Sequence, residues 1–302
     1  MTLLRAAIAC VALLIAPSAI AQPPLWTVRT PHATLILFGS IHLLPPGLDW
    51  EPPALAAALA RANEVWFELP IDDLTDGEAG RLAQDRGLLP KGDSLFNHLS
   101  AREMTRLSNA GTRVNIPAKF LAPMRPWLAE VTLSLAQDGQ AGAIAGQGVE
   151  QQISLQAPPA AHRRAFETAG QQIAFLASAP MADQVASLDE TLGEIIDDPG
   201  LYQRVVRTWL DGDLAGLQKD ALDPLAKASP RLYRRLITDR NRRWSGILAR
   251  RLEGSGVIVV VVGTGHLVGP RGLPALLRAK GLTVQGPGQP TGPEASAAPA
   301  AH

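Results

Sequence analysis

Residues 257–262 read Val-Ile-Val-Val-Val-Val, and this run decides the fold class. An uninterrupted β-branched run is apolar on both faces of a strand, which is typical of the middle of a parallel sheet. A turn, a helix over about residues 273–280 and a short strand over 282–285 come next. The C-terminal part of the chain therefore predicts a strand–helix–strand (βαβ) unit.

The N-terminal part of the chain predicts a second such unit. Residues 25–29 and 33–38 are rich in β-forming residues and flank a Thr-Pro pair, which indicates a hairpin. Two prolines open an Ala- and Leu-rich helix over about residues 52–62, and residues 64–69 read as the next strand. A strand, a helix and a strand at this spacing indicate parallel strands.

The middle of the chain, about residues 95–250, reads as a helical insertion. We expect helices near residues 100–111, 120–137, 161–177, 181–194, 202–210 and 232–252, and a Gly- and Ala-rich loop over 139–148. The predicted fold class is therefore α/β, with a central, mostly parallel sheet built from the two terminal βαβ units and a largely helical middle region.

The two ends of the chain differ in composition from the rest. Residues 1–21 combine Arg5, a short apolar stretch and an Ala-Ile-Ala sequence, which is typical of a secretory signal peptide cleaved after Ala21. We therefore expect a periplasmic or secreted protein with one domain over residues 22–285. Residues 286–302 contain mainly Pro, Gly, Ala and Ser, which predicts a disordered tail.

Composition excludes several function classes. Cys10 is the only cysteine and lies in the expected signal, so disulfides and a cysteine nucleophile are excluded from the mature chain. Lys plus Arg and Asp plus Glu each number 28, so the chain is near neutral and nucleic acid is not an expected partner. No later apolar stretch is long enough to span a membrane. A peptide or small molecule remains as the expected substrate, and the sequence leaves the oligomeric state open.

Two short motifs match at opposite ends of the domain. Residues 39–46 and 263–270 both read Gly, a hydroxyl residue, any residue, His, Leu, an aliphatic residue, any residue, Pro. Both follow an apolar strand, so His42 and His266 are expected at the carboxyl edge of the sheet, where open parallel sheets bind ligands. Glu68 ends a third strand and should lie on the same edge.

These residues suggest a metal centre. Two imidazoles and a carboxylate are suitable ligands for a divalent ion such as manganese, cobalt or zinc, so His42, His266 and Glu68 are the candidate ligands. The motif hydroxyls, Ser40 and Thr264, could orient an imidazole or a bound water and are candidate substrate-binding residues. Glu150 and Glu167 could be further site carboxylates, but glutamates on helix surfaces are common, and we favour that interpretation.

At these motifs the chain resembles the TraB/GumN family, which includes the Tiki proteins. The resemblance implies that the two Gly-x-x-His motifs, Glu68 and the pair Arg240–Asn241 form the site. It covers about residues 25–285. Tiki proteins are described as metal-dependent proteases, and the fold is similar to that of erythromycin-esterase-like and haem-binding proteins.

Three functions follow as hypotheses. The first is a metal-dependent hydrolase of the peptidase kind, in which the ion activates water and Arg240, oriented by Asn241, binds a substrate carboxylate or an oxyanion. The second is a metal-free, esterase-like hydrolase in which a histidine is the general base. The third is a non-catalytic protein that binds haem or a peptide in the same crevice.

Overall fold

A computed structural model describes residues 22–288, and the expected signal peptide and residues 289–302 lie outside this range. One six-stranded sheet has the order β4-β3-β5-β2-β1-β6. The strands β4, β3, β5 and β2 are parallel, whereas β1 pairs antiparallel with both β2 and β6. The strands are β1 (Leu25–Arg29), β2 (Ala33–Ser40), β3 (Glu64–Phe67), β4 (His162–Ala165), β5 (Gly256–Gly263) and β6 (Val284–Gln285). The predicted α/β class with a mostly parallel sheet is confirmed.

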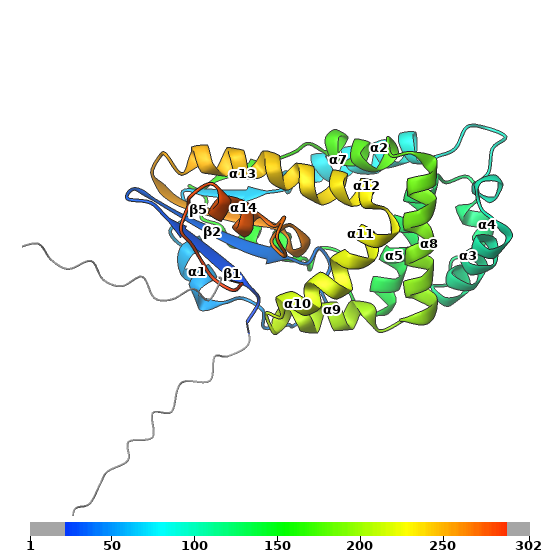
Figure 1. The fold of residues 1–302 in the computed structure, drawn as a ribbon, viewed down its shortest axis with the longest axis horizontal. Coiled ribbons are helices and arrows are strands. Elements are labelled where there is room, and N and C mark those ends of the chain that lie inside the picture. The colour runs from blue at the N-terminus through cyan, green and yellow to red at the C-terminus, as the bar shows by residue number, and fades with distance from the viewer. Residues whose placement is uncertain (1–21, 289–302) are drawn as a thin grey trace, which may run out of the picture.

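The two predicted βαβ units are interleaved. Strands β2 and β3 run in the same direction, as expected, but β5 lies between them and pairs with both. At the other end of the chain, β6 is not a neighbour of β5, because β2 and β1 separate them and β6 pairs with β1. The apolar run of β5 therefore occupies the centre of the sheet, where both of its faces are covered (Figure 1).

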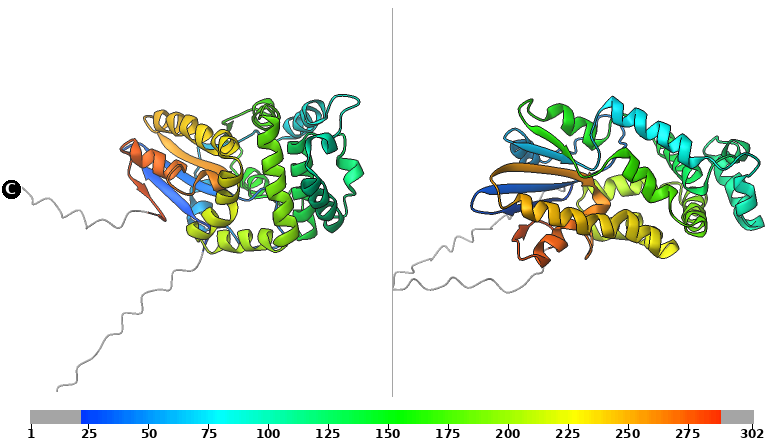
Figure 2. Two further views of the ribbon diagram at one scale, coloured as in Figure 1. Left: turned by 45° about the vertical axis from the view of Figure 1, so that its right-hand side comes forward. Right: turned by 90° about the horizontal axis from the view of Figure 1, so that it is seen from above.

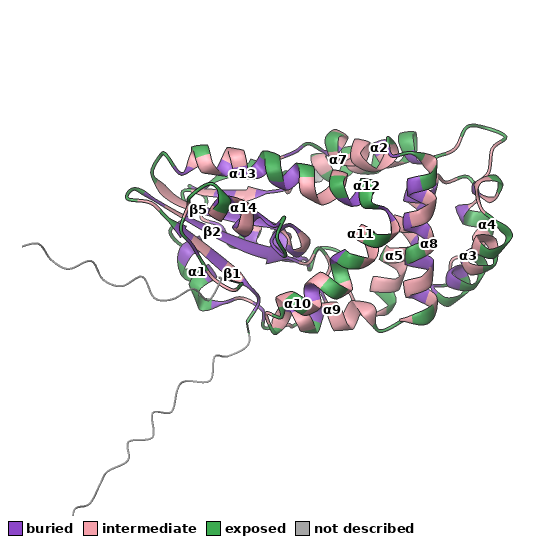
Figure 3. Ribbon diagram, viewed as in Figure 1, coloured by how far each residue is buried: buried purple, intermediate pink, exposed green. Residues whose placement is uncertain are grey.

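Both faces of β5 are buried, which is why the run is apolar at every position. Val259 and Val261 pack with the helices α1 (Pro53–Leu59), α6 (Val149–Gln156) and α9 (Leu201–Leu210). Ile258, Val260 and Val262 pack on the other face with α13 (Asp239–Arg251) and α14 (Leu273–Ala279). Figures 2 and 3 show the buried sheet between these helical layers.

The remaining helices extend from the carboxyl edge of the sheet. A third, separate hydrophobic core joins α3, α4, α5 and α8 at the end farthest from the sheet (Figure 1). The remaining helices of the described chain are, in order, α2 (Asp73–Gly87), η1 (Leu95–His98), α3 (Ala101–Arg113), α4 (Ala118–Leu121), α5 (Pro126–Gln140), α7 (Ala169–Ala177), α8 (Met181–Asp197), α10 (Leu214–Leu217), η2 (Gln218–Leu222), α11 (Asp223–Ala228), α12 (Pro230–Tyr233), η3 (Arg234–Thr238) and η4 (Thr264–His266). Within residues 22–288, no helix is both long and apolar enough to cross a membrane.

The structure departs from the expected helices at two elements, β4 and α2. The helix expected over 161–177 begins only at Ala169, because His162–Ala165 form the parallel edge strand β4 and Thr168 caps the following helix. The helix α2 was not expected from the sequence, because its apolar residues do not gather on one face as they do in an amphipathic helix. The chain is also placed beyond residue 285, since the Pro287 carbonyl accepts a hydrogen bond from Trp26 Nε1 at 2.8 Å.

Candidate functional site

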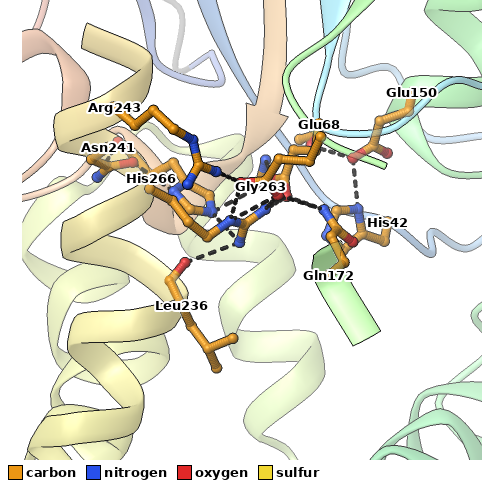
Figure 4. Close-up of polar contacts among 12 residues, drawn as sticks. His42, Glu68, Glu150, Gln172, Leu236, Asn241, Arg243, Gly263 and His266 are labelled. Carbon is orange, nitrogen blue, oxygen red and sulfur yellow. Dashed lines mark hydrogen bonds and ion pairs between the residues drawn. The ribbon is translucent and has the colours of Figure 1, made fainter. Parts of the chain in front are cut away.

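The two Gly-x-x-His motifs leave the sheet side by side. In the parallel pairing of β2 and β5, Ser40 lies opposite Gly263, so both strands end at the same level of the sheet. Glycine is required where the motifs meet, because a Cβ on Gly39 would lie 2.7 Å from Thr264 Oγ1. Figure 4 shows His42, His266 and Glu68 gathered at this edge, as the sequence predicts.

Glu68 follows β3 and is buried, with four groups around its carboxylate. Oε1 accepts a hydrogen bond from the Gly263 amide at 2.8 Å and lies 3.6 Å from His266 Nε2. Oε2 accepts from Gln172 Nε2 at 3.1 Å and forms a close ion pair with Arg240. Burial would raise the pKa of Glu68, but the electrostatic effect of the neighbouring His266, Arg240 and His42 and the hydrogen bond from the Gly263 amide outweigh burial and lower the pKa. Glu68 is therefore a carboxylate at neutral pH.

Arg240 is the cation that compensates two buried glutamates. Its Nη2 contacts Glu68 and lies 2.8 Å from Oε2 of Glu167, a residue between β4 and α7 whose side chain is fully buried. Its Nη1 donates to the Leu236 carbonyl at 2.9 Å, within the π-helical turn η3. The guanidinium also lies over the Trp244 ring, 4.7 Å from its centre. Arg240 therefore organises the buried acids, and its side chain is only 8% exposed.

His266 is a neutral imidazole of defined tautomer. The Asn241 amide donates from Nδ2 to the carbonyls of His266 and Arg271, so its Oδ1 faces His266 Nδ1 at 2.6 Å. Nδ1 must then carry the proton, and Nε2 accepts from Arg240 Nη1 at 3.0 Å. Burial lowers the pKa of His266 to about 3, and Arg240 adds to the shift. Asn241 thus orients His266, which lies behind Arg240 and away from solvent.

His42 differs from His266 in both exposure and charge. Its side chain is 69% exposed, and Nδ1 lies 2.6 Å from Oε1 of Glu150. The negative charge of Glu150 raises the pKa of His42, although solvent screens this exposed ion pair. Among the described residues, Nε2 makes no hydrogen bond, so it is the free nitrogen of the site.

Glu150 and Glu167, interpreted from the sequence as helix-surface residues, are instead buried in the site. Glu150 is 5% exposed near the start of α6, and Glu167 is 3% exposed between β4 and α7. No periodicity reveals this burial, because α6 is short and β4 is a polar strand of four residues. A mid-chain Gly148 is the one local signal: a Cβ there would lie 2.0 Å from the His42 carbonyl oxygen.

The two motif hydroxyls are buried and play different parts. Ser40 donates to Oε1 of Glu150 at 2.5 Å, and so supports the carboxylate that pairs with His42. Thr264 Oγ1 has no hydrogen-bond partner within residues 22–288 and packs against Gly39. Neither residue lines the cleft described next.

An open cleft of about 240 Å³ lies over this edge of the sheet. His42, Glu68 and Glu150 line it, together with Phe67, Leu69, Pro70, Ile71, Asp76, Gln151 and Gln172. His266, Arg240 and Asn241 do not. The cleft is therefore lined by one imidazole with a free nitrogen and by two buried carboxylates, those of Glu68 and Glu150, while the arginine and the second histidine support them from behind.

A family model for the TraB/PrgY/gumN family matches residues 24–286. The chain belongs to the TraB/PrgY/gumN family. The TraB/PrgY/gumN match covers both Gly-x-x-His motifs and every residue of the cleft. The chain is also similar to the protein "Uncharacterized protein YbaP" of Escherichia coli (strain K12), with 28% identity over 244 residues, which is 80% of this chain and 87% of the relative. The protein of the same name in Shigella flexneri gives the same values. No solved structure matches the chain.

The predicted ligand set does not fit a metal ion in the arrangement seen in this TraB/PrgY/gumN chain. The lone pair of His266 Nε2 accepts from Arg240, and Glu68 Oε2 pairs with the same guanidinium. A divalent ion would have to displace this cation or lie against it. Across the described part of the chain, no three His, Cys, Asp or Glu side chains are grouped to hold a metal. The chemistry proposed below therefore uses only the protein's own groups.

Proposed function

We propose that the protein is an exported hydrolase that cleaves an acyl bond, in a peptide or an ester, with His42 as general base. The observation that carries the proposal is the pair of His42 and Glu150 at the cleft, 2.6 Å apart, with Nε2 of His42 free. A histidine oriented by a carboxylate is the usual arrangement for taking a proton from a nucleophile. The site thus favours the metal-free hydrolase among the functions considered from the sequence.

The proposed reaction needs a water beside His42 and a carbonyl carbon next to it. Nε2 removes a proton from the water as its oxygen attacks the carbonyl carbon, and Glu150 stabilises the imidazolium that forms. The same proton then passes to the leaving amine or alcohol as its bond to carbon breaks. The N-terminus of α6, which has no side-chain cap, would stabilise the negative charge on the carbonyl oxygen.

The pH dependence of the rate tests the role of His42. A base must be unprotonated, so kcat/KM should rise with pH through a pKa above the ordinary histidine value, because Glu150 raises it. In the Glu150→Gln variant, the rise of kcat/KM should move to a lower pH, toward about 6.5, the unperturbed pKa of histidine. We would measure hydrolysis of 4-nitrophenyl acetate and fluorescein-labelled casein, before and after dialysis against a chelator. A rate that falls with pH, or that disappears with the metal, would contradict the proposal.

Export is the second part of the proposal and rests on the signal-like residues 1–21. When the full chain is expressed in a bacterial host, the protein recovered from the periplasm or medium should begin at Gln22. N-terminal sequencing and intact mass would show this. Recovery of the chain only in the cytoplasm, with residues 1–21 intact, would argue against export.

A further inference from the structure

Asp76 carries the one uncompensated charge on the cleft wall. The other two carboxylates there have partners, since Glu68 pairs with Arg240 and Glu150 with His42. Asp76, on α2, is exposed, and in the described part of the chain its side chain has no ion pair or hydrogen bond. No lysine or arginine lines the cleft. The cleft therefore has an excess negative charge even when His42 is protonated.

Two further acceptors on the same wall lack donors. Oε2 of Glu150 and Oε1 of Gln151 are buried and, within residues 22–288, make no hydrogen bond. The Glu150 side chain is 93% buried, being 7% exposed. Unpaired buried acceptors cost stability, which a ligand that donates N–H groups would recover. The negative charge of the cleft and its unpaired acceptors both favour a ligand that is a cation and donates hydrogen bonds.

Four apolar residues also line the cleft. Phe67, Leu69, Pro70 and Ile71 flank and follow Glu68 on the segment that runs from the end of β3 toward α2. A ligand that fits this wall carries an aliphatic group next to its cation. Arg240, which the sequence analysis assigned to a substrate carboxylate, has its donors facing Glu68, Glu167, His266 and Leu236.

We infer that the cleft selects substrates with a primary ammonium group next to an apolar side chain, such as a peptide with a free N-terminus and an apolar first residue. Asp76 is the specificity-determining residue. This inference rests on the proposed function in using the same cleft, because the carbonyl of that first residue would lie beside His42. An ammonium group has three N–H donors and no acceptor, which suits a cleft lined by the carboxylate of Asp76 and the unpaired acceptors of Glu150 and Gln151.

Binding measurements test the inference without requiring turnover. We would titrate the full-length mature protein with L-leucyl-L-leucinamide and with its N-acetyl form by calorimetry. The work would be done near pH 6.5, where an α-amino group with a pKa of about 7.7–8.0 is charged. The free amine should bind about tenfold more tightly than the acetylated form, the difference of one charge-assisted hydrogen bond. Asp76→Asn should remove most of this preference.

Glu78→Gln is the matched control, because Glu78 is an exposed acid on the same helix that does not line the cleft. It should retain the full preference for the free amine. Equal binding of the two peptides by the unmodified protein, or the same result for both variants, would overturn the inference. Failure of the hydrolase proposal would appear separately, as an absence of His42-dependent turnover of the ester and casein.

Discussion

Replacing Arg240 by methionine is expected to lower the free energy of unfolding by about 3–5 kcal/mol, the range found when one partner of a buried ion pair is removed. Methionine keeps much of the side-chain length but leaves Glu68 and Glu167 facing each other without this cation. Glu167 is fully buried, and among the described residues the only cation it then retains is Arg243, whose side chain is 44% exposed. A domain stability of about 5–15 kcal/mol could lose a large fraction by this one change.

The pH dependence of this loss identifies its cause. In the unmodified protein the pKa of Glu68 is lowered, so its contribution to stability is present above the unfolded value of 4.5 and is lost as the pH falls below it. Without Arg240, burial should raise the pKa of Glu68, so the variant recovers stability as the pH falls and Glu68 takes up a proton. The difference between the two proteins should therefore be largest near neutral pH and shrink in acid.

Urea unfolding followed by circular dichroism would measure both effects. Arg242→Met is the matched control, since Arg242 is on the same helix, 74% exposed, and pairs only with Asp239. Its loss should be below about 1 kcal/mol. Adding Glu68→Gln to Arg240→Met should restore part of the stability, because it removes one unpaired charge. An Arg240→Met protein as stable as the control would contradict the role given to this ion pair.

Replacing His42 by alanine should reduce kcat/KM by about 10²–10⁴-fold, the usual contribution of a general base. The fold should remain intact, because the His42 side chain is 69% exposed and removes little packing when truncated. Alanine at His266 should act differently. That residue is 4% exposed and packs against Trp244 with ring centres 4.5 Å apart, so its loss should lower stability as well as rate.

Rates on the ester and on casein, together with urea unfolding, would separate these two histidines. His162→Ala is the control, since His162 is an exposed histidine on β4 outside the cleft. It should change neither measurement. Hydrolysis that survives in His42→Ala would remove the proposed base. An unmodified protein with no turnover at all would instead favour the binding-protein hypothesis, which a ligand screen including haem would then test.

The sheet and the position of the two histidines could be predicted because local signals specify them. The β-branched run of β5 indicates a buried strand, and matched motifs after parallel strands must meet at one edge. The strand order could not be predicted, because nothing local says that β5 lies between β2 and β3. Sequence adjacency favours neighbouring strands, and here long-range packing overrides it.

The partners of the two histidines were the harder part of the site. Glu150 and Glu167 lie on segments whose polar sequences indicate exposure to solvent. Only the fold shows that Glu150 faces the imidazole of His42 and that Glu167 faces the buried guanidinium of Arg240. Gln172 bridges Glu68 and Glu167, with Nε2 distances of 3.1 and 3.3 Å to their carboxylates. The metal expectation was reasonable from residue types alone. It did not anticipate that Arg240 occupies the space between the candidate ligands.

The position of β5 also affects when the protein can fold. Its residues 256–263 lie near the C-terminal end of the domain, yet they pair with β2 and β3 near the beginning. During synthesis the early strands must wait for more than half of the chain before the centre of the sheet can form, because contacts so distant in sequence close late. A chain threaded through an export channel from its N-terminus would therefore remain unfolded until its C-terminal part has followed. A truncation before residue 256 should yield no folded fragment, rather than a smaller stable domain.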